Sequence, residues 1–212
     1  RGRGDVYKRQ FEDCGNPGQW LVDGECFVTK GVGRVLLEPL PGVKLDVFVT
    51  HTAHNPAKEH GYTNAVYRKN QVKEMIEKRI LKSNADMIIL GGDLNDVPVD
   101  DKDSPYHIVL REMQNCIEEL FCESGQWLKM EYVTYANPSN TFTLDDEEPV
   151  MIDYIFRRTN SPEKVISWTS SFHLPMFKIP RLTTFNIKQE NMELMSVSDH
   201  EAMATEIQIC RI

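Results

Sequence analysis

Hydrophobic and polar positions follow two recognisable patterns in the first half of the chain. Residues 32–38 alternate and then run apolar, residues 39–42 supply prolines and a glycine that break the run, and residues 44–50 are strand-like again, so a β-hairpin is expected over residues 31–51. Residues 64–82 instead carry apolar side chains at helical spacing, namely Val72, Met75, Ile76 and Ile80. This spacing predicts an amphipathic helix.

The pattern continues with further strands and a second helix. The short apolar run at residues 87–90 predicts a strand buried on both faces, and Gly91-Gly92 is expected to end it. Ser104-Pro105 predicts a helix start, with serine as the cap and proline in the first turn. Short strands are expected at residues 141–143, 150–157, 165–172 and 202–209, and a long loop at residues 175–195. Strands interspersed with two helices indicate an α/β layered protein.

Charge changes the interpretation of the chain start. Residues 1–10 hold four basic residues and one acid, and Asp5-Val6-Tyr7-Lys8-Arg9-Gln10 resembles a sequencing-adaptor read-through, so this segment is interpreted as a foreign tail outside the fold; a flexible basic tail is the alternative. Removing its +3 from the formal charge of −8 leaves −11 for residues 11–212. Because nucleic-acid affinity depends on basic side chains that neutralise phosphates, no nucleic-acid partner is expected.

Acids and histidines stand at the ends of the predicted buried strands, where a rigid scaffold presents side chains to a cleft. Taken singly, each segment has an ordinary interpretation, since Gly-Asp-x-Asn is common in turns and Ser-Asp-His can cap a helix. The four segments are Thr50-His51, Gly92-Asp93-Leu94-Asn95, Ile152-Asp153-Tyr154 and Ser198-Asp199-His200.

In this order the segments resemble the endonuclease/exonuclease/phosphatase superfamily, whose fold is a DNase I-like four-layer α/β/β/α sandwich. Within the superfamily the chain is most similar to the neutral sphingomyelinases. The resemblance covers about residues 11–210, with poor matching across 175–196. Three stretches carry it: Lys30-Gly31-Val32-Gly33, Met151-Ile152-Asp153-Tyr154-Ile155-Phe156 and Ser198-Asp199-His200-Glu201-Ala202.

The resemblance implies Mg²⁺-dependent hydrolysis of sphingomyelin to ceramide and phosphocholine by in-line attack of water. It implies that Asp93 orients and deprotonates the water and that Asn95 donates a hydrogen bond to a phosphate oxygen. It also implies that His200 stabilises charge on the phosphoryl group, with Asp153 holding an imidazole N–H and His51 completing a pair of imidazoles.

Two further residues take roles from the resemblance. Asp199 is expected to approach Mg²⁺ directly or through water, because magnesium prefers carboxylates and keeps waters. Lys30 is expected to lie near the substrate. In sphingomyelinases this lysine pairs with an aspartate five residues earlier, whereas Glu25 stands there in this chain. A solvated lysine before a glycine turn is the alternative for Lys30.

One departure from the superfamily concerns the chain start. Superfamily members begin with a strand that carries an asparagine, followed by a strand that ends in Gln-Glu, whose glutamate is the principal Mg²⁺ ligand. Nothing ahead of Phe11 matches either strand. The expectation is therefore that residues 11–212 are the C-terminal portion of a single domain, with N-terminal strands missing, and that this polypeptide alone has little activity.

The sequence is compatible with more than one substrate and function. Sphingomyelin or a related phospholipid at a membrane surface is the expected partner, with peripheral association at the cytoplasmic face or in a secreted form; residues 172–177 either dip into the lipid or pack in the core. A nuclease or an inositol-polyphosphate phosphatase on the same fold is a second hypothesis. A non-catalytic binding module is a third, and its mark would be loss of the acid or histidine positions.

Overall fold

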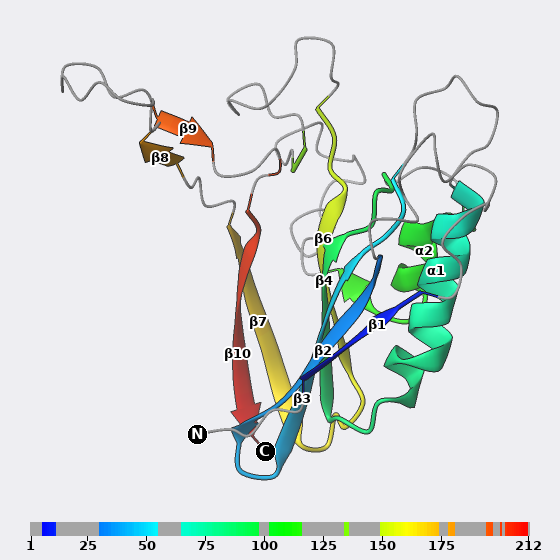
Figure 1. Ribbon diagram of the computed structural model, residues 1–212. Helices are drawn as coiled ribbons and strands as arrows, with labels where there is room; N and C mark the ends of the chain where they lie inside the picture. Colours follow the sequence, from blue (N-terminus) through cyan, green and yellow to red (C-terminus); the bar gives the residue numbers. More distant parts are fainter. Residues whose placement is uncertain are drawn as a thin grey trace.

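A computed structural model describes residues 6–11, 30–54, 65–97, 102–115, 134–135, 149–173, 178–180, 194–196, 200 and 202–211. Its elements follow one another along the chain as drawn in Figure 1. They are β1 Val6–Gln10, β2 Gly31–Leu40, β3 Val43–His51, α1 Ala65–Lys78, the 3₁₀ helix η3 Ile80–Lys82, β4 Met87–Asp93, α2 Pro105–Leu110, β5 Gln114–Asn115, β6 Asp153–Thr159, β7 Val165–His173, β8 Lys178–Pro180, β9 Leu194–Ser196 and β10 Ala204–Arg211.

Six strands form the main sheet, in the order β1-β2-β3-β4-β6-β5. β2 and β3 are the predicted hairpin, and Gly42 in its turn has a φ of 76°, which glycine adopts without steric strain. β3 and β4 are parallel and are connected through α1, so both strands end at the same edge of the sheet. β6 is antiparallel to β4 and therefore begins at that edge.

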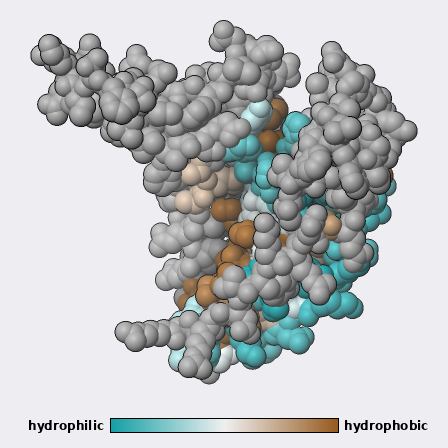
Figure 2. Space-filling model, in the orientation of Figure 1, coloured by the Kyte–Doolittle hydropathy of each residue, from teal (hydrophilic) through white to brown (hydrophobic). Residues whose placement is uncertain are grey.

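The helices cover one face of the main sheet (Figure 1). The four apolar residues that predict α1 and its continuation are all buried, and they pack with strand residues such as Phe48, Ile88 and Leu90 in the larger core cluster. The predicted helix of residues 64–82 is interrupted at Arg79, whose φ of −127° and ψ of −65° separate α1 from η3. Figure 2 shows hydrophilic side chains along the outer side of this helix layer.

A second, two-stranded sheet of β7 and β10 lies against the other face of the main sheet. Ile209 of β10 packs on a smaller core cluster formed by Val43, Leu45 and Met87. Since successive side chains of a strand point to opposite faces, β4 supplies Met87 to this cluster and Ile88 to the helix side. The described residues thus form helix, sheet and sheet layers, and the predicted α/β class is confirmed.

Three expectations about the elements are corrected. β4 does not end at Gly91 but continues through Gly92 to Asp93, because both glycines still pair with β3 and β6. The stretch expected as one long loop contains β8 and β9, which pair with each other. Val6–Gln10, placed outside the fold by sequence, pairs with β2 as an edge strand; the foreign origin of residues 1–10 stays a prediction.

Of two other expectations, one lies outside the described residues and one is corrected within them. The strand expected at residues 141–143 lies outside them. The strand expected from Val150 begins at Asp153, and Val150 forms an isolated bridge with Tyr135 instead. In the part of the chain that the structure describes, no helix is both long enough and apolar enough to cross a membrane.

Candidate active site

Three of the predicted side chains stand in one row at the sheet edge. His51 is the last residue of β3 and pairs with Asp93, the last residue of β4. Asp93 pairs in turn with Asp153, the first residue of β6. Two parallel strands that end together and an antiparallel strand that begins beside them therefore bring an imidazole and two carboxylates to one edge.

Gly92 allows the three strands to approach closely at this edge. Its φ is 135°, a conformation that side-chain-bearing residues rarely adopt. A Cβ added there would lie 2.0 Å from the carbonyl oxygen of Thr50 on β3. The glycine before Asp93 is thus required by packing, so the carboxylate position depends on it.

The segment after β4 is a tight turn held by the Asp93 side chain. The backbone amide of Asn95 donates to Oδ1 of Asp93 at 2.6 Å, and Nδ2 of Asn95 donates to Oδ2 at 3.0 Å. Asn95 has a φ of 48°, which asparagine tolerates better than most residues. Nδ2 also donates to the carbonyl of Thr52 at 3.1 Å. In this arrangement Asn95 supports Asp93, while donation to a phosphate oxygen stays a prediction.

Burial and a second acid change the pKa of the Asp93 carboxyl, and the residue is only 8% exposed. Desolvation, together with the nearby Asp153 carboxylate, raises the pKa of Asp93 from 3.8 to about 6. The Asn95 amide and the positive charges of His200 and Lys30 act in the opposite direction and lower this pKa. A carboxyl with a pKa near 6 can both hold and release a proton close to neutral pH.

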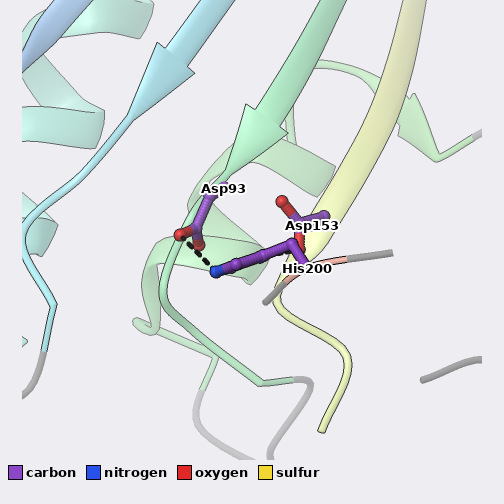
Figure 3. Close-up of side chains that lie close together, drawn as sticks. All are labelled: Asp93, Asp153 and His200. Carbon is purple, nitrogen blue, oxygen red and sulfur yellow. Dashed lines mark hydrogen bonds and ion pairs between the residues drawn. The ribbon is translucent and has the colours of Figure 1, made fainter. Parts of the chain in front are cut away.

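His200 reaches the same place from the far end of the chain. Nδ1 of its ring donates to Oδ2 of Asp153 at 2.8 Å, and its Nε2 lies 3.9 Å from Oδ2 of Asp93. Figure 3 shows the ring beside Asp153, with a ring nitrogen directed toward the Asp93 carboxylate. Since Asp153 accepts from Nδ1, the other ring nitrogen faces Asp93 and the space in front of it.

His51 and Lys30 complete the row on the β3 side. Nε2 of His51 lies 2.7 Å from Nζ of Lys30 and 3.2 Å from Oδ2 of Asp93. An imidazole nitrogen can accept from the lysine or donate to the carboxylate, but not both at once. Lys30 is buried, at 7% exposure, so the alternative of a solvated lysine is wrong.

The donor set suits a divalent cation through its carboxylates. One ligand atom each from Asp93, Asp153 and His200 lies within 4.8 Å of the others. Mg²⁺ is bound in proteins by one or two carboxylates, with waters and substrate phosphates filling its remaining positions, so the two carboxylates fit this ion. Asp199, the ligand expected from sequence, lies outside the described residues.

The structure therefore brings together every predicted site residue that it describes. Sequence reasoning missed three supporting residues, of which Thr52, directly after β3, could have been found by its place at a strand end. Its amide donates to the carbonyl of Asp93 at 3.1 Å, and its hydroxyl donates to the carbonyl of Leu94 at 2.6 Å. Thr134 and Tyr135 carry no signal of this kind, because they belong to no predicted strand.

The layers and the site at the strand ends define a DNase I-like fold. No family model matches the chain, and no curated protein matches its sequence. Solved structures share the fold. Sphingomyelinase C from Streptomyces griseocarneus is 14% identical, with a TM-score of 0.62 over 94% of this chain and 63% of its own.

Two other structures are similar at the same level. Beta toxin from Staphylococcus aureus with bound magnesium ions is 17% identical, with a TM-score of 0.56 over 84% of this chain and 57% of its own. TDP2 from D. rerio, complexed with a single-stranded DNA product, is 15% identical, with a TM-score of 0.55 over 96% and 67%. The chain thus spans about two thirds or less of these proteins, and the likeness concerns the fold.

Proposed function

We propose that the gene product containing this chain is a Mg²⁺-dependent phosphodiesterase that hydrolyses sphingomyelin to ceramide and phosphocholine. The observation that carries the proposal is the meeting of Asp93 and His200, which come from opposite halves of the chain and lie 3.9 Å apart at the sheet edge. A scaffold protein has no need for a buried acid of raised pKa beside an imidazole at this position.

The side chains present supply the parts that phosphodiester hydrolysis requires. Asp93 accepts a proton from the attacking water, and the water oxygen bonds to phosphorus as the P–O bond to the ceramide oxygen breaks. The leaving oxygen takes up a proton from solvent water. His200, oriented by Asp153, stabilises the charge on the phosphoryl oxygens. Lys30 and His51 provide further positive charge and hydrogen bonds on the β3 side of the phosphate.

Mg²⁺ would be held by carboxylates at this edge, with Asp199 as the expected ligand and Asp153 as a second donor. When bound, the ion polarises the phosphoryl group and neutralises part of its charge. It also reverses the local field of an acidic site toward an anionic substrate. This explains how an acidic chain can act on a phosphate ester.

Sphingomyelin is favoured over other phosphodiesters by the resemblance of three sequence stretches to the neutral sphingomyelinases, and sphingomyelinase C is among the structures that share the fold. We place the protein peripherally at a membrane surface on the same ground. The formal charge of −8 weakens a polyanion as substrate. The expectation of no nucleic-acid partner is nevertheless unsupported, since DNA-bound TDP2 shares the fold, and a nuclease is therefore the second candidate.

The test measures release of phosphocholine from sphingomyelin vesicles by the complete gene product and by this chain, with Mg²⁺ and after EDTA treatment, beside cleavage of single-stranded DNA. We expect Mg²⁺-dependent phosphocholine release by the complete gene product and little release by this chain alone. His200→Ala should lower the rate of the complete gene product at least about 100-fold. His107→Ala, which changes a half-buried histidine in α2, is the matched control. DNA cleavage without phosphocholine release favours the nuclease, and no loss in the His200→Ala variant overturns both functions.

A further inference from the structure

Thr134 holds the backbone at the start of β6. Its Oγ1 accepts a hydrogen bond from the amide of Ile152 at 3.0 Å and another from the amide of Asp153 at 3.1 Å. Its own amide donates to the carbonyl of Val150 at 3.1 Å, and the residue is completely buried. One hydroxyl oxygen thus satisfies two consecutive amides, the second of which belongs to Asp153 itself.

Tyr135, the next residue, holds the partner of that carboxylate. It exchanges backbone hydrogen bonds with Val150 at 3.0 and 3.1 Å, and it also forms a β-bridge with His200. Its ring lies against the imidazole of His200, with ring centroids 5.1 Å apart and planes inclined by 52°. Backbone and side chain of one residue therefore both contact His200.

We propose that Thr134 and Tyr135 form a two-residue brace that positions the Asp153–His200 pair. Thr134 fixes the position of the Asp153 backbone through a hydrogen bond, and Tyr135 fixes the position of His200 through its backbone bridge and its ring. Because the two residues are adjacent in sequence, a single peptide unit fixes the separation of the two halves of the pair. For its catalytic consequence the inference rests on the proposed function, while the placement itself does not.

The physical reason lies in the geometry of the pair. The hydrogen bond from Nδ1 of His200 to Oδ2 of Asp153 is 2.8 Å long, and a displacement of either backbone lengthens or misaligns it. Without that bond the ring loses its fixed orientation toward Asp93. Residues that orient a site through its primary groups typically change activity by about 10- to 100-fold when they are altered.

The first arm of the test is spectroscopic and needs no substrate. The proton on Nδ1 of His200 is followed by NMR in the ¹⁵N-histidine-labelled complete gene product, with its signal assigned through His200→Gln. Thr134→Val removes the acceptor, and we expect the signal to shift or broaden. Thr134→Ser keeps the oxygen and should retain the signal. Thr159→Val, the same change at the far end of β6, is the matched control.

Tyr135 is tested in the same way. Tyr135→Leu removes the ring and should broaden the signal, whereas Tyr135→Phe keeps the ring and should preserve it. If Thr134→Val and Tyr135→Leu lower the melting temperature but leave the Nδ1 signal unchanged, the residues are merely structural and the brace is disproved. Should Thr134→Val fail to fold, the proposal is tested by the Nδ1 signal of Tyr135→Leu compared with that of Tyr135→Phe: equal signals in the two variants would disprove the brace.

The second arm is kinetic. With sphingomyelin vesicles, Thr134→Val is expected to lower kcat by about 10- to 100-fold with KM nearly unchanged, since the brace contacts no substrate. Thr134→Ser should restore most of the rate. A gene product that hydrolyses no phosphodiester disproves the proposed function but leaves the spectroscopic result standing. An equal loss of rate in Thr134→Ser and Thr134→Val disproves the brace alone.

Discussion

β4 has a buried aspartate at each end, and the two acids behave in opposite ways. Asp86 directly precedes the strand and Asp93 is its last residue, with exposures of 4% and 8%. The pKa of Asp86 is lowered from 3.8 to about 2, whereas the pKa of Asp93 is raised to about 6. Both residues have little solvent exposure, but the surroundings of Asp93 desolvate its carboxyl more strongly and include a second acid, whereas hydrogen-bond donors and a lysine surround Asp86. Desolvation and the partners of each carboxylate together decide the difference.

Asp86 is surrounded by donors. Desolvation by burial alone would raise its pKa, but hydrogen bonds from the ammonium of Lys164 at 2.7 Å, from the amide of Lys44 at 2.8 Å and from Ser161 outweigh it. Its backbone carbonyl also accepts from the amides of Asn160 and Ser161. These contacts join the start of β4 to the segment after β6, and the charge stabilises the fold.

Asp93 instead faces Asp153 across the pair of strands, and its carboxyl is therefore held at the cost of stability. When it is ionised, a buried acid opposite another acid lowers the stability of the folded state. Its raised pKa nevertheless suits it to proton transfer. The comparison teaches that one end of β4 is arranged for stability and the other for chemistry.

The largest expected effect is on rate. In the complete gene product, Asp93→Asn should lower kcat on sphingomyelin vesicles by about 10²- to 10⁴-fold, because the amide cannot accept the proton of water. Asp86→Asn should leave kcat per folded molecule unchanged. The measurement is phosphocholine release normalised to the folded fraction. Equal losses in both variants would remove the functional distinction between the two ends.

The second effect is on stability: the substitution that lowers kcat, Asp93→Asn, is expected to raise the free energy of unfolding. Below pH 3.8 Asp93 is protonated in both states; above pH 6 the folded state carries the charge, so stability is lost as pH rises from about 4 to 6. A pKa rise from 3.8 to about 6 corresponds to about 3 kcal/mol. Asp93→Asn should therefore raise the free energy of unfolding by up to about 3 kcal/mol at pH 7.

Urea unfolding in metal-free buffer measures this effect at pH 3.5 and pH 7. The gain should be close to zero at the lower pH, where the wild-type carboxyl is already neutral. A variant that is less stable than wild type at pH 7 would show that the acid is not strained in the fold.

A smaller effect of the reverse sign is expected at Asp86. Its lowered pKa contributes stability above pH 3.8, and this contribution is lost as pH falls through about 2. Asp86→Asn should therefore lower the free energy of unfolding at pH 7 by about 2 kcal/mol. The same urea titrations, extended to pH 2, should show the two curves converging. A constant difference across this range would contradict the assignment.

The smallest effect concerns the cation beside Asp86. The side chain of Lys164 is 50% exposed, so water and salt screen its charge. Lys164→Met should cost about 0.5–1 kcal/mol at low ionic strength and less in 0.5 M salt. Lys82→Met, which removes an exposed lysine from η3, is the control. A loss equal to that of Asp86→Asn would mean that Lys164 alone accounts for the lowered pKa.

Local pattern was enough for several parts of the fold. The hairpin, the amphipathic helix, the capped second helix and the apolar strand were predicted because each depends on side-chain periodicity or on the backbone preferences of proline and glycine. The pairing of Val6–Gln10 with β2 was missed, since an edge strand has little periodicity and depends on its neighbour. The continuation of β4 through Gly91 was missed for a related reason, because pairing on both sides holds glycines that favour a turn locally.

The amino-acid sequence by itself determined which side chains are available to the site. Its strand-end positions named His51, Asp93, Asn95, Asp153 and His200, and the resemblance to the sphingomyelinases added Lys30. Only the tertiary structure decided their distances, the raised pKa of Asp93 and the contacts of Thr134 and Tyr135 with the Asp153–His200 pair. The reason is that periodicity reports which face of an element is buried. Distances and electric fields depend instead on how strands far apart in the chain pair and end together.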